Sequence, residues 1–267
     1  MHSRMLHFIS VNVRGLRNKE KREKIFKWLN YQKFDIVLMQ ETFVTQDLEN
    51  ILKSERKCLL FFNNGTNHSK GVMIGVKNNL PLNIKECITQ PGGRVIGVRF
   101  SFDKKCYFLV NVYAPTKSSE KRTFFKRFLS WLEKHKHTDD YLLLGGDWNS
   151  VQNPHIDTQG LSHAHKSDNF FQKIRIKFNL IDIWRKCHPT LRQFTWRQNF
   201  LGYFSRLDYW LIPYDLCSFV YSSDIRPILK CDHNAVSLKL KLISSPRGKG
   251  VWKFNNALLK DTEFKKK

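Results

Sequence analysis

The rest of the chain is organised around one run, Leu142-Leu143-Leu144-Gly145-Gly146-Asp147-Trp148-Asn149-Ser150. Three consecutive leucines predict a strand that is buried on both faces. The two glycines after them allow the backbone to turn sharply and to approach another group closely. Asp147 and Asn149 then follow at the mouth of a sheet, where α/β proteins bind their ligands. The run alone leaves a turn and a site equally open, because Asp and Asn also close ordinary turns.

Length and composition indicate a folded globular protein. The chain has 267 residues, enough for one large domain or two small ones with a substantial core. Hydrophobic residues make up 41% and aromatic residues 13%, which argues against a disordered chain. No segment approaches the roughly 18 consecutive apolar residues that a membrane span requires. Six scattered cysteines without a CxxC pair indicate a reduced, intracellular protein with buried thiols.

The net charge points to a polyanionic partner. The chain carries 46 Lys and Arg against 23 Asp and Glu, a net charge of +23. Nucleic acid is the first candidate partner and an anionic membrane surface is the second. A merely solvated lysine surface is the remaining interpretation. The mutual repulsion of so many positive charges, which no partner would relieve, argues against this interpretation.

Hydrophobic periodicity predicts alternating strands and helices. We expect helices at 19–32 (with Asn18 as N-cap), 45–54, 118–137 and 168–178. We expect strands at 6–13, 34–39, 57–63, 71–77, 94–102, 106–113, 142–147, 194–196 and 207–212, and a last one after His233 with one buried and one wet face. This mixture predicts an α/β protein with two sheets packed face to face and helices outside. Residues 1–243 would form the domain, 244–250 a linker and 251–267 a basic tail.

Polar residues recur where the predicted strands end or begin. Asn12, Glu41, Tyr113, Asp147 and Asn149 follow strand ends, and Asp208, Asp232 and His233 lie where later strands start. Strand ends gather at the rim of a sheet, so these side chains can converge. Each has an ordinary interpretation as a turn residue, a helix cap, a rim tyrosine or a core histidine. Eight such coincidences favour a site.

The residue types in this set suit the hydrolysis of a phosphodiester by water. Glu41 offers a hard oxygen ligand for Mg²⁺, and a metal ion together with a histidine can neutralise charge on a phosphate. Asp147 can orient or deprotonate a water molecule. Asp208 can hold the His233 imidazole in one tautomer and raise its pKa. The sequence contains neither a GxSxG elbow nor a GxxxxGK[ST] loop, so a covalent intermediate is not indicated.

Seven motifs in order resemble the endonuclease–exonuclease–phosphatase superfamily, and within it the endonuclease domain of LINE-type (non-LTR) retrotransposons. The resemblance covers residues 5 to about 243. The motifs are Ser10-Val11-Asn12-Val13-Arg14-Gly15, Gln40-Glu41-Thr42, Asn111-Val112-Tyr113-Ala114-Pro115, Gly146-Asp147-Trp148-Asn149, Phe194-Thr195-Trp196, Ser205-Arg206-Leu207-Asp208-Tyr209 and Asp232-His233.

The resemblance implies a DNase I-like four-layer α/β sandwich and a nuclease that nicks double-stranded DNA to prime reverse transcription. It implies Mg²⁺ as the cofactor, with Mn²⁺ as the alternative, and an intracellular location, nuclear at the site of action with the cytoplasm as the alternative. By position, it makes Glu41 the metal ligand with Asn12 beside it and Asp232 next to the metal. Tyr113 and Asn149 would contact the phosphate, Asp147 would activate the water, Asp208 would support His233 as the phosphate donor, and Thr195 and the loop after it would contact DNA.

Two positions depart from the family pattern. Abasic-site repair members carry Asp two residues after the first Asn, where this chain has Arg14. This argues against an abasic-repair enzyme and weakens the expected metal binding. Cys231 replaces the usual Ser before Asp232 and loses a hydroxyl contact. Residues 251–261 resemble the segment that precedes a reverse transcriptase, so we expect a truncated or domesticated element product, or an isolated domain.

The loop 197–204 is rich in aromatic residues and carries a basic one. With Arg197, Phe200 and Tyr203 it predicts a hairpin tip that enters a DNA groove or stacks on an unpaired base. The alternative is a loop that packs Phe200 and Phe204 onto its own sheet. For the whole chain, the competing functions are a catalytically inactive DNA-binding remnant and a phosphatase or phosphodiesterase of the same fold that acts on lipids or nucleotides.

Overall fold

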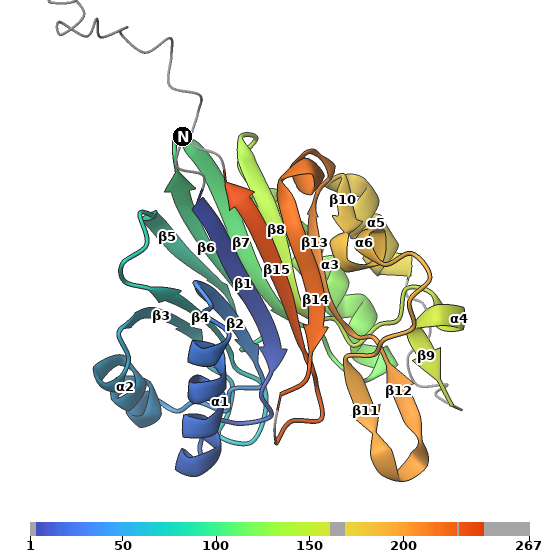
Figure 1. Cartoon of the computed structure of the whole chain (residues 1–267), viewed down its shortest axis with the longest axis horizontal. Helices are drawn as coiled ribbons and strands as arrows, with labels where there is room; N and C mark the ends of the chain where they lie inside the picture. Colours follow the sequence, from blue (N-terminus) through green and yellow to red (C-terminus); the bar gives the residue numbers. More distant parts are fainter. Residues whose placement is uncertain (1–3, 161–168, 229, 243–267) are drawn as a thin grey trace, which may run out of the picture.

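The computed structural model describes residues 4–160, 169–228 and 230–242 (Figure 1). The predicted linker 244–250 and the basic tail 251–267 therefore lie outside the described residues. None of the helices in the described ranges combines the length and apolar character that a membrane crossing requires.

Two six-stranded sheets lie face to face (Figure 1). The first has the order β14 (Val220–Arg226), β15 (Ala235–Leu242), β1 (Arg4–Asn12), β2 (Ile36–Gln40), β4 (Val72–Lys77) and β3 (Cys58–Asn63). The second has the order β10 (Leu180–Asp182), β13 (Asp208–Pro213), β8 (Asp140–Asp147), β7 (Lys105–Tyr113), β6 (Val95–Phe102) and β5 (Asn83–Gln90). Both sheets are mixed, because β1 and β2 are parallel, as are β7 and β8, whereas the other pairs are antiparallel.

Helices cover the outer face of each sheet. Helices α1 (Lys19–Tyr31) and α2 (Gln46–Glu55) pack on the first sheet, and α3 (Ser118–His135) and α5 (Asn169–Lys177) pack on the second. A third apolar cluster fills the space between the sheets. The predicted four-layer α/β sandwich is therefore confirmed. The shorter elements are α4 (Pro154–Asp157), α6 (Ile183–Cys187), η2 (Asn199–Leu201), η3 (Tyr214–Phe219) and a small sheet of β11 (Trp196–Gln198), β12 (Tyr203–Ser205) and β9 (Thr158–Gln159).

The leucine run forms β8 at the centre of the second sheet, and its three leucines are fully buried. Leu143 faces the core between the sheets, whereas Leu142 and Leu144 face α3. Gly145 has no room for a side chain, because a Cβ there would lie 2.5 Å from Leu38 and 2.7 Å from Trp210. The strand is therefore buried on both faces, as the sequence predicts.

Gly146→Ala should lower the free energy of unfolding by about 2–4 kcal/mol. Gly146 has φ +144°, and an added Cβ would overlap the carbonyl oxygen of Val112 on the neighbouring strand. Urea unfolding measures the change. Gly202→Ala is the control, because Gly202 also has a positive φ (+65°) but open space around it, so only about 1 kcal/mol is expected there. Equal losses in the two variants would contradict the role of the Val112 contact.

The predicted helices match the observed ones within two residues, and Asn18 caps α1 by accepting a hydrogen bond from the Lys21 amide at 2.8 Å. Strands β5 and β14 were not predicted. Strand β5 is polar and largely exposed, so its hydrophobic pattern is weak, and pairing with β6 defines it. The loop predicted at 197–204 contains parts of β11 and β12 and is a hairpin.

Two further expectations need correction. The thiols are free but mostly not buried, because Cys87 and Cys187 are exposed and only Cys231 is buried. The wet face of β15 is shorter than predicted, since Ser237 is buried and donates to the Asp224 carbonyl. Lys239 is half-buried, and Lys241 is exposed.

Candidate active site

The strand ends meet at one edge of the sandwich. Asn12 pairs with Gln40 where the parallel strands β1 and β2 end, and Tyr113 pairs with Asp147 where β7 and β8 end. Antiparallel pairing then places Asp208, the first residue of β13, opposite Asp147. The fold thus gathers side chains that are far apart in the sequence.

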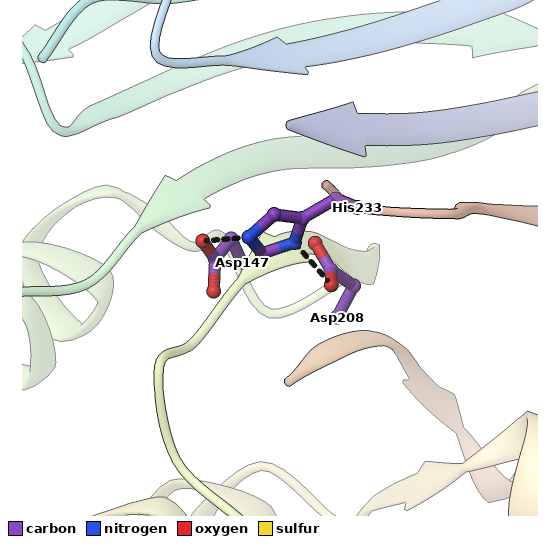
Figure 2. A group of neighbouring side chains, drawn as sticks. All are labelled: Asp147, Asp208 and His233. Carbon is purple, nitrogen blue, oxygen red and sulfur yellow. Dashed lines mark hydrogen bonds and ion pairs between the residues drawn. The ribbon is translucent and has the colours of Figure 1, made fainter. Parts of the chain in front are cut away.

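His233 lies between two carboxylates (Figure 2). Its Nδ1 is 2.9 Å from Oδ2 of Asp208, and its Nε2 is 3.9 Å from Oδ2 of Asp147. All three residues are buried. The bond to Asp208 orients the ring, whereas 3.9 Å is beyond hydrogen-bond range. The Nε2 nitrogen is therefore left to donate to a substrate oxygen.

The pKa values of this group are shifted by burial and by close charges. Burial raises the pKa of the Asp147 carboxyl well above its ordinary value, and the negative charge of Asp208 adds to the rise. Burial alone would lower the pKa of His233, but Asp208 and Asp147 outweigh this effect and raise it. A charged imidazolium between two carboxylates follows, which is a suitable proton donor for a phosphate.

Asn12 connects this group to Glu41. Its Nδ2 donates to Oε1 of Glu41 at 2.8 Å and to Oδ2 of Asp147 at 3.0 Å. The Tyr113 hydroxyl donates to the same Glu41 oxygen at 2.9 Å. Burial and the charge of Glu41 raise the pKa of Tyr113 far above its ordinary value, so the hydroxyl keeps its proton. One network therefore spans both sheets.

Asn149 is held against Asp147. Its backbone N–H donates to Oδ1 of Asp147 at 2.9 Å, and its side-chain Nδ2 donates to the Ala114 carbonyl at 2.9 Å. Asn149 has φ +47°, in the left-handed region that Asn tolerates better than most residues. The carboxamide is thus fixed beside the Asp147 carboxylate.

The oxygen atoms that could act as metal ligands at this edge suit a hard divalent cation. Both hydrogen bonds to Glu41 use Oε1, which leaves Oε2 as a ligand. Oδ1 of Asp232 is buried without a hydrogen-bond partner, and a cation would satisfy it. Carboxylate and amide oxygens are the ligands that Mg²⁺ prefers. Asp147, Asp208 and His233 also offer three ligand atoms within 4.8 Å of one another, but the hydrogen bond to Asp208 already engages Nδ1 of His233.

Arg14, the departure from the abasic-repair pattern, forms an ion pair with Asp232. The Arg14 Nη1 lies 3.1 Å from Oδ2 of Asp232, and the Arg14 side chain is 66% exposed. A guanidinium therefore neutralises one of the expected metal-site carboxylates at the rim.

The predicted DNA-binding residues fall into two places. Thr195 is fully buried, and its hydroxyl oxygen accepts hydrogen bonds from the amides of Leu207 and Asp208 at 2.8 and 3.1 Å. It therefore supports Asp208 and offers no surface to DNA. Arg197, Phe200 and Tyr203 lie on the β11–β12 hairpin, where Phe200 is 98% exposed at the tip. The alternative interpretation, in which Phe200 and Phe204 pack onto their own sheet, holds only for Phe204, whose ring contacts the ring of Phe194.

Two residues near the site have roles that were not predicted from the sequence. Arg206 is buried and binds Asp157 through Nε and Nη2 at 2.8 and 3.0 Å, which anchors the segment leading into Asp208. Lys121 is buried on α3, and its ammonium donates to the Asn149 carbonyl. The sequence did contain a signal for Lys121, because it falls on the apolar stripe of α3, three and four residues before Phe124 and Phe125.

A groove of about 900 Å³ opens beside Tyr113, between α3 and the turn before β6. Arg94 stacks on the Tyr113 ring, with its guanidinium carbon 4.9 Å from the ring centroid, and Lys126 and Arg127 line the groove further along. Glu120 is the one acidic residue in the lining. This side of the site is therefore basic.

Comparison with known proteins identifies the family. Residues 9–229 match the model of the Endonuclease/Exonuclease/phosphatase family, and the chain belongs to this family. The expected superfamily is thereby confirmed. The chain is also 30% identical over 263 residues to the uncharacterized 149 kDa protein of transposon TX1 from Xenopus laevis. This match covers 98% of the chain but 20% of that protein, so the chain spans about a fifth of its length.

Two solved structures share the fold. The AP endonuclease LMAP from Leishmania major superposes with a TM-score of 0.71 and 19% identity, over 90% of this chain and 89% of that one. An AP endonuclease from Archaeoglobus fulgidus superposes with a TM-score of 0.72 and 21% identity, over 89% of this chain and all of that one. At this level of identity the likeness establishes the fold.

Proposed function

We propose that the chain is a divalent-metal-dependent DNA endonuclease that hydrolyses one phosphodiester bond and nicks its target to prime reverse transcription. Its cofactor is Mg²⁺, with Mn²⁺ as the alternative. One observation carries the proposal: the buried His233, held by Asp208, faces Asp147, which Asn12 connects to Glu41. This arrangement combines a proton donor, a base for water and a metal ligand within one network.

The residues divide the reaction between them. Glu41, Asn12 and Asp232 would hold the metal ion, which supplies charge neutralisation on the phosphate when bound. Asp147 orients the attacking water and accepts its proton. His233 donates from Nε2 as the imidazolium to a phosphate oxygen, and Asp208 accepts the Nδ1 proton and so orients the ring. Asn149 and Tyr113 hold the scissile phosphate by hydrogen bonds.

Three observations support DNA as the substrate. The net charge of +23 suits a polyphosphate backbone, and the basic groove beside Tyr113 continues that charge away from the site. The hairpin presents an unpacked aromatic ring at its tip, which suits insertion into a groove or stacking on a base. The similarity to a transposon protein supports a role in element insertion.

Nicking of supercoiled plasmid tests the function. We expect relaxed circles in the presence of Mg²⁺ or Mn²⁺ and none after the metal is removed by EDTA. Salt-sensitive DNA binding without cleavage under either metal would instead indicate an inactive remnant. Faster turnover of a soluble phosphomonoester than of DNA would indicate a phosphatase.

Phe200→Ala should weaken binding to duplex DNA about tenfold and leave the melting temperature unchanged. The side chain is 98% exposed, so its removal takes away a DNA contact and no packing. Fluorescence anisotropy with a labelled duplex in Ca²⁺ measures the affinity. Tyr221→Ala is the control, because Tyr221 is also exposed but lies at the end of β14 that is remote from His233. Equal affinities of the Phe200 variant and the wild-type chain would contradict the role of the hairpin.

A further inference from the structure

Lys121 occupies a place where a lysine is costly. It lies near the N-terminus of α3, on the face that otherwise buries Phe124, Phe125 and Phe128, and its own exposure is 5%. Burial of an ammonium group is unfavourable unless its partners compensate. A positive charge near the N-terminus of a helix also opposes the helix dipole. An apolar residue here would complete the aromatic face without either penalty.

The ammonium is directed at the catalytic edge. Its Nζ donates to the backbone carbonyl of Asn149, the residue in the left-handed conformation two positions after Asp147. That conformation directs the Asn149 amide N–H to Oδ1 of Asp147 and the carboxamide toward Ala114 and Oδ2 of Asp147, at 2.9 and 3.4 Å. A helix on the outer layer thus supports the turn that carries two catalytic groups.

We propose that Lys121 is a positioning residue of the active site, which holds the Asn149 peptide so that its carboxamide and the Asp147 carboxylate keep their relative orientation. This inference rests on the proposed function, because the phosphate contact of Asn149 and the base role of Asp147 belong to it. The lysine itself does not touch the reacting atoms. Its effect is on the turnover of bound DNA, because misplacement of a catalytic group by about 1 Å can lower a rate on the order of 100-fold.

Lys121→Met and Lys121→Arg test the proposal in the full chain. Methionine keeps the length and packing of the lysine stem but removes the donor and the charge, whereas arginine keeps both. We expect kcat for plasmid nicking to fall about 10- to 100-fold in the methionine variant with less than about a threefold change in KM. Arginine should restore most of kcat. The melting temperature should shift by no more than about 2–4 °C, because the lost hydrogen bond is offset by relief from burying a charge.

Lys134→Met is the matched control, since Lys134 lies on the same helix, is exposed and does not line the basic groove. Unchanged kcat in the Lys121→Met variant would overturn the proposal, as would an equal loss in the control. If the methionine variant does not fold, Lys121→Gln keeps a neutral donor, and loss of folding there too would assign Lys121 to stability alone. Absence of nicking by the wild-type chain would instead refute the proposed function. In that case a crystal structure of the Lys121→Met variant tests the positioning role independently of activity. If Asn149 keeps its position and its positive φ in that variant, the positioning role is overturned.

Discussion

Asp147→Asn should lower the rate of plasmid nicking by about 10³- to 10⁴-fold, because the amide cannot accept the proton of the attacking water. Most of the shape of the site should survive, since an Asn oxygen in the place of Oδ1 can still accept the bond from the Asn149 amide, although the bond that Asn12 donates to Oδ2 is lost. Stability should change little. Burial beside Asp208 raises the pKa of Asp147, which means that the charged carboxylate is costly in the folded state, and a neutral amide removes this cost and so offsets the lost hydrogen bond. The variant therefore separates activity from folding.

Single-turnover nicking and thermal unfolding measure the two effects of this variant. Asp139→Asn removes an exposed carboxylate and serves as the control, with a rate and melting temperature equal to those of the wild-type chain. His233→Ala should also lose most of its activity, since Nε2 of this ring is the proposed donor. Nicking that survives both the Asp147 and the His233 changes would refute the assigned roles.

Glu41→Gln should reduce nicking at low Mg²⁺ by more than about 100-fold and raise the metal concentration required for half-maximal rate. Glutamine is a neutral and weaker ligand, but its amide can still meet the Tyr113 hydroxyl and preserve the local contacts. Titration calorimetry with Mn²⁺ in the absence of DNA reports the metal affinity independently of the reaction.

The control for the metal experiment is Glu55→Gln, which removes a carboxylate at the exposed end of α2. Its metal titration should superimpose on that of the wild-type chain. If Glu41→Gln binds Mn²⁺ with wild-type affinity, Glu41 is not the metal ligand. If it loses activity at every metal concentration, the bonds of Glu41 to Asn12 and Tyr113 have a role of their own in the reaction.

Local patterns were sufficient for most of the secondary structure. The leucine run forms β8, and the Asn18 cap and the apolar stripes define the helices, because these signals depend on neighbours within a few residues. Strand β5 was not predicted, because its polar residues show no clear alternation and its pairing with β6 defines it. The burial of the thiols was predicted wrongly, because composition does not tell which side of a sheet a cysteine faces.

The site residues were also visible as polar residues at strand ends, but their partners were not. Thr195 belongs to a family motif, yet only the fold shows that its hydroxyl is used by the backbone of Leu207 and Asp208. Arg14 stands out as a departure in sequence, but its pairing with Asp232, 218 residues away, depends on two loops that meet at the rim.

The amino-acid sequence alone was enough to predict the family and the layered α/β architecture and to suggest the proposed chemistry, because each rests on residue types in local order. The run 142–150, however, was compatible with either an ordinary turn or a functional site. The tertiary structure resolved how the run is placed by bringing Asn12, which is 135 residues from Asp147, to within 3.0 Å of that carboxylate, and by placing His233 and Lys121 around it. Such contacts arise from the pairing of distant strands and the closure of long loops, and no local pattern encodes their distances.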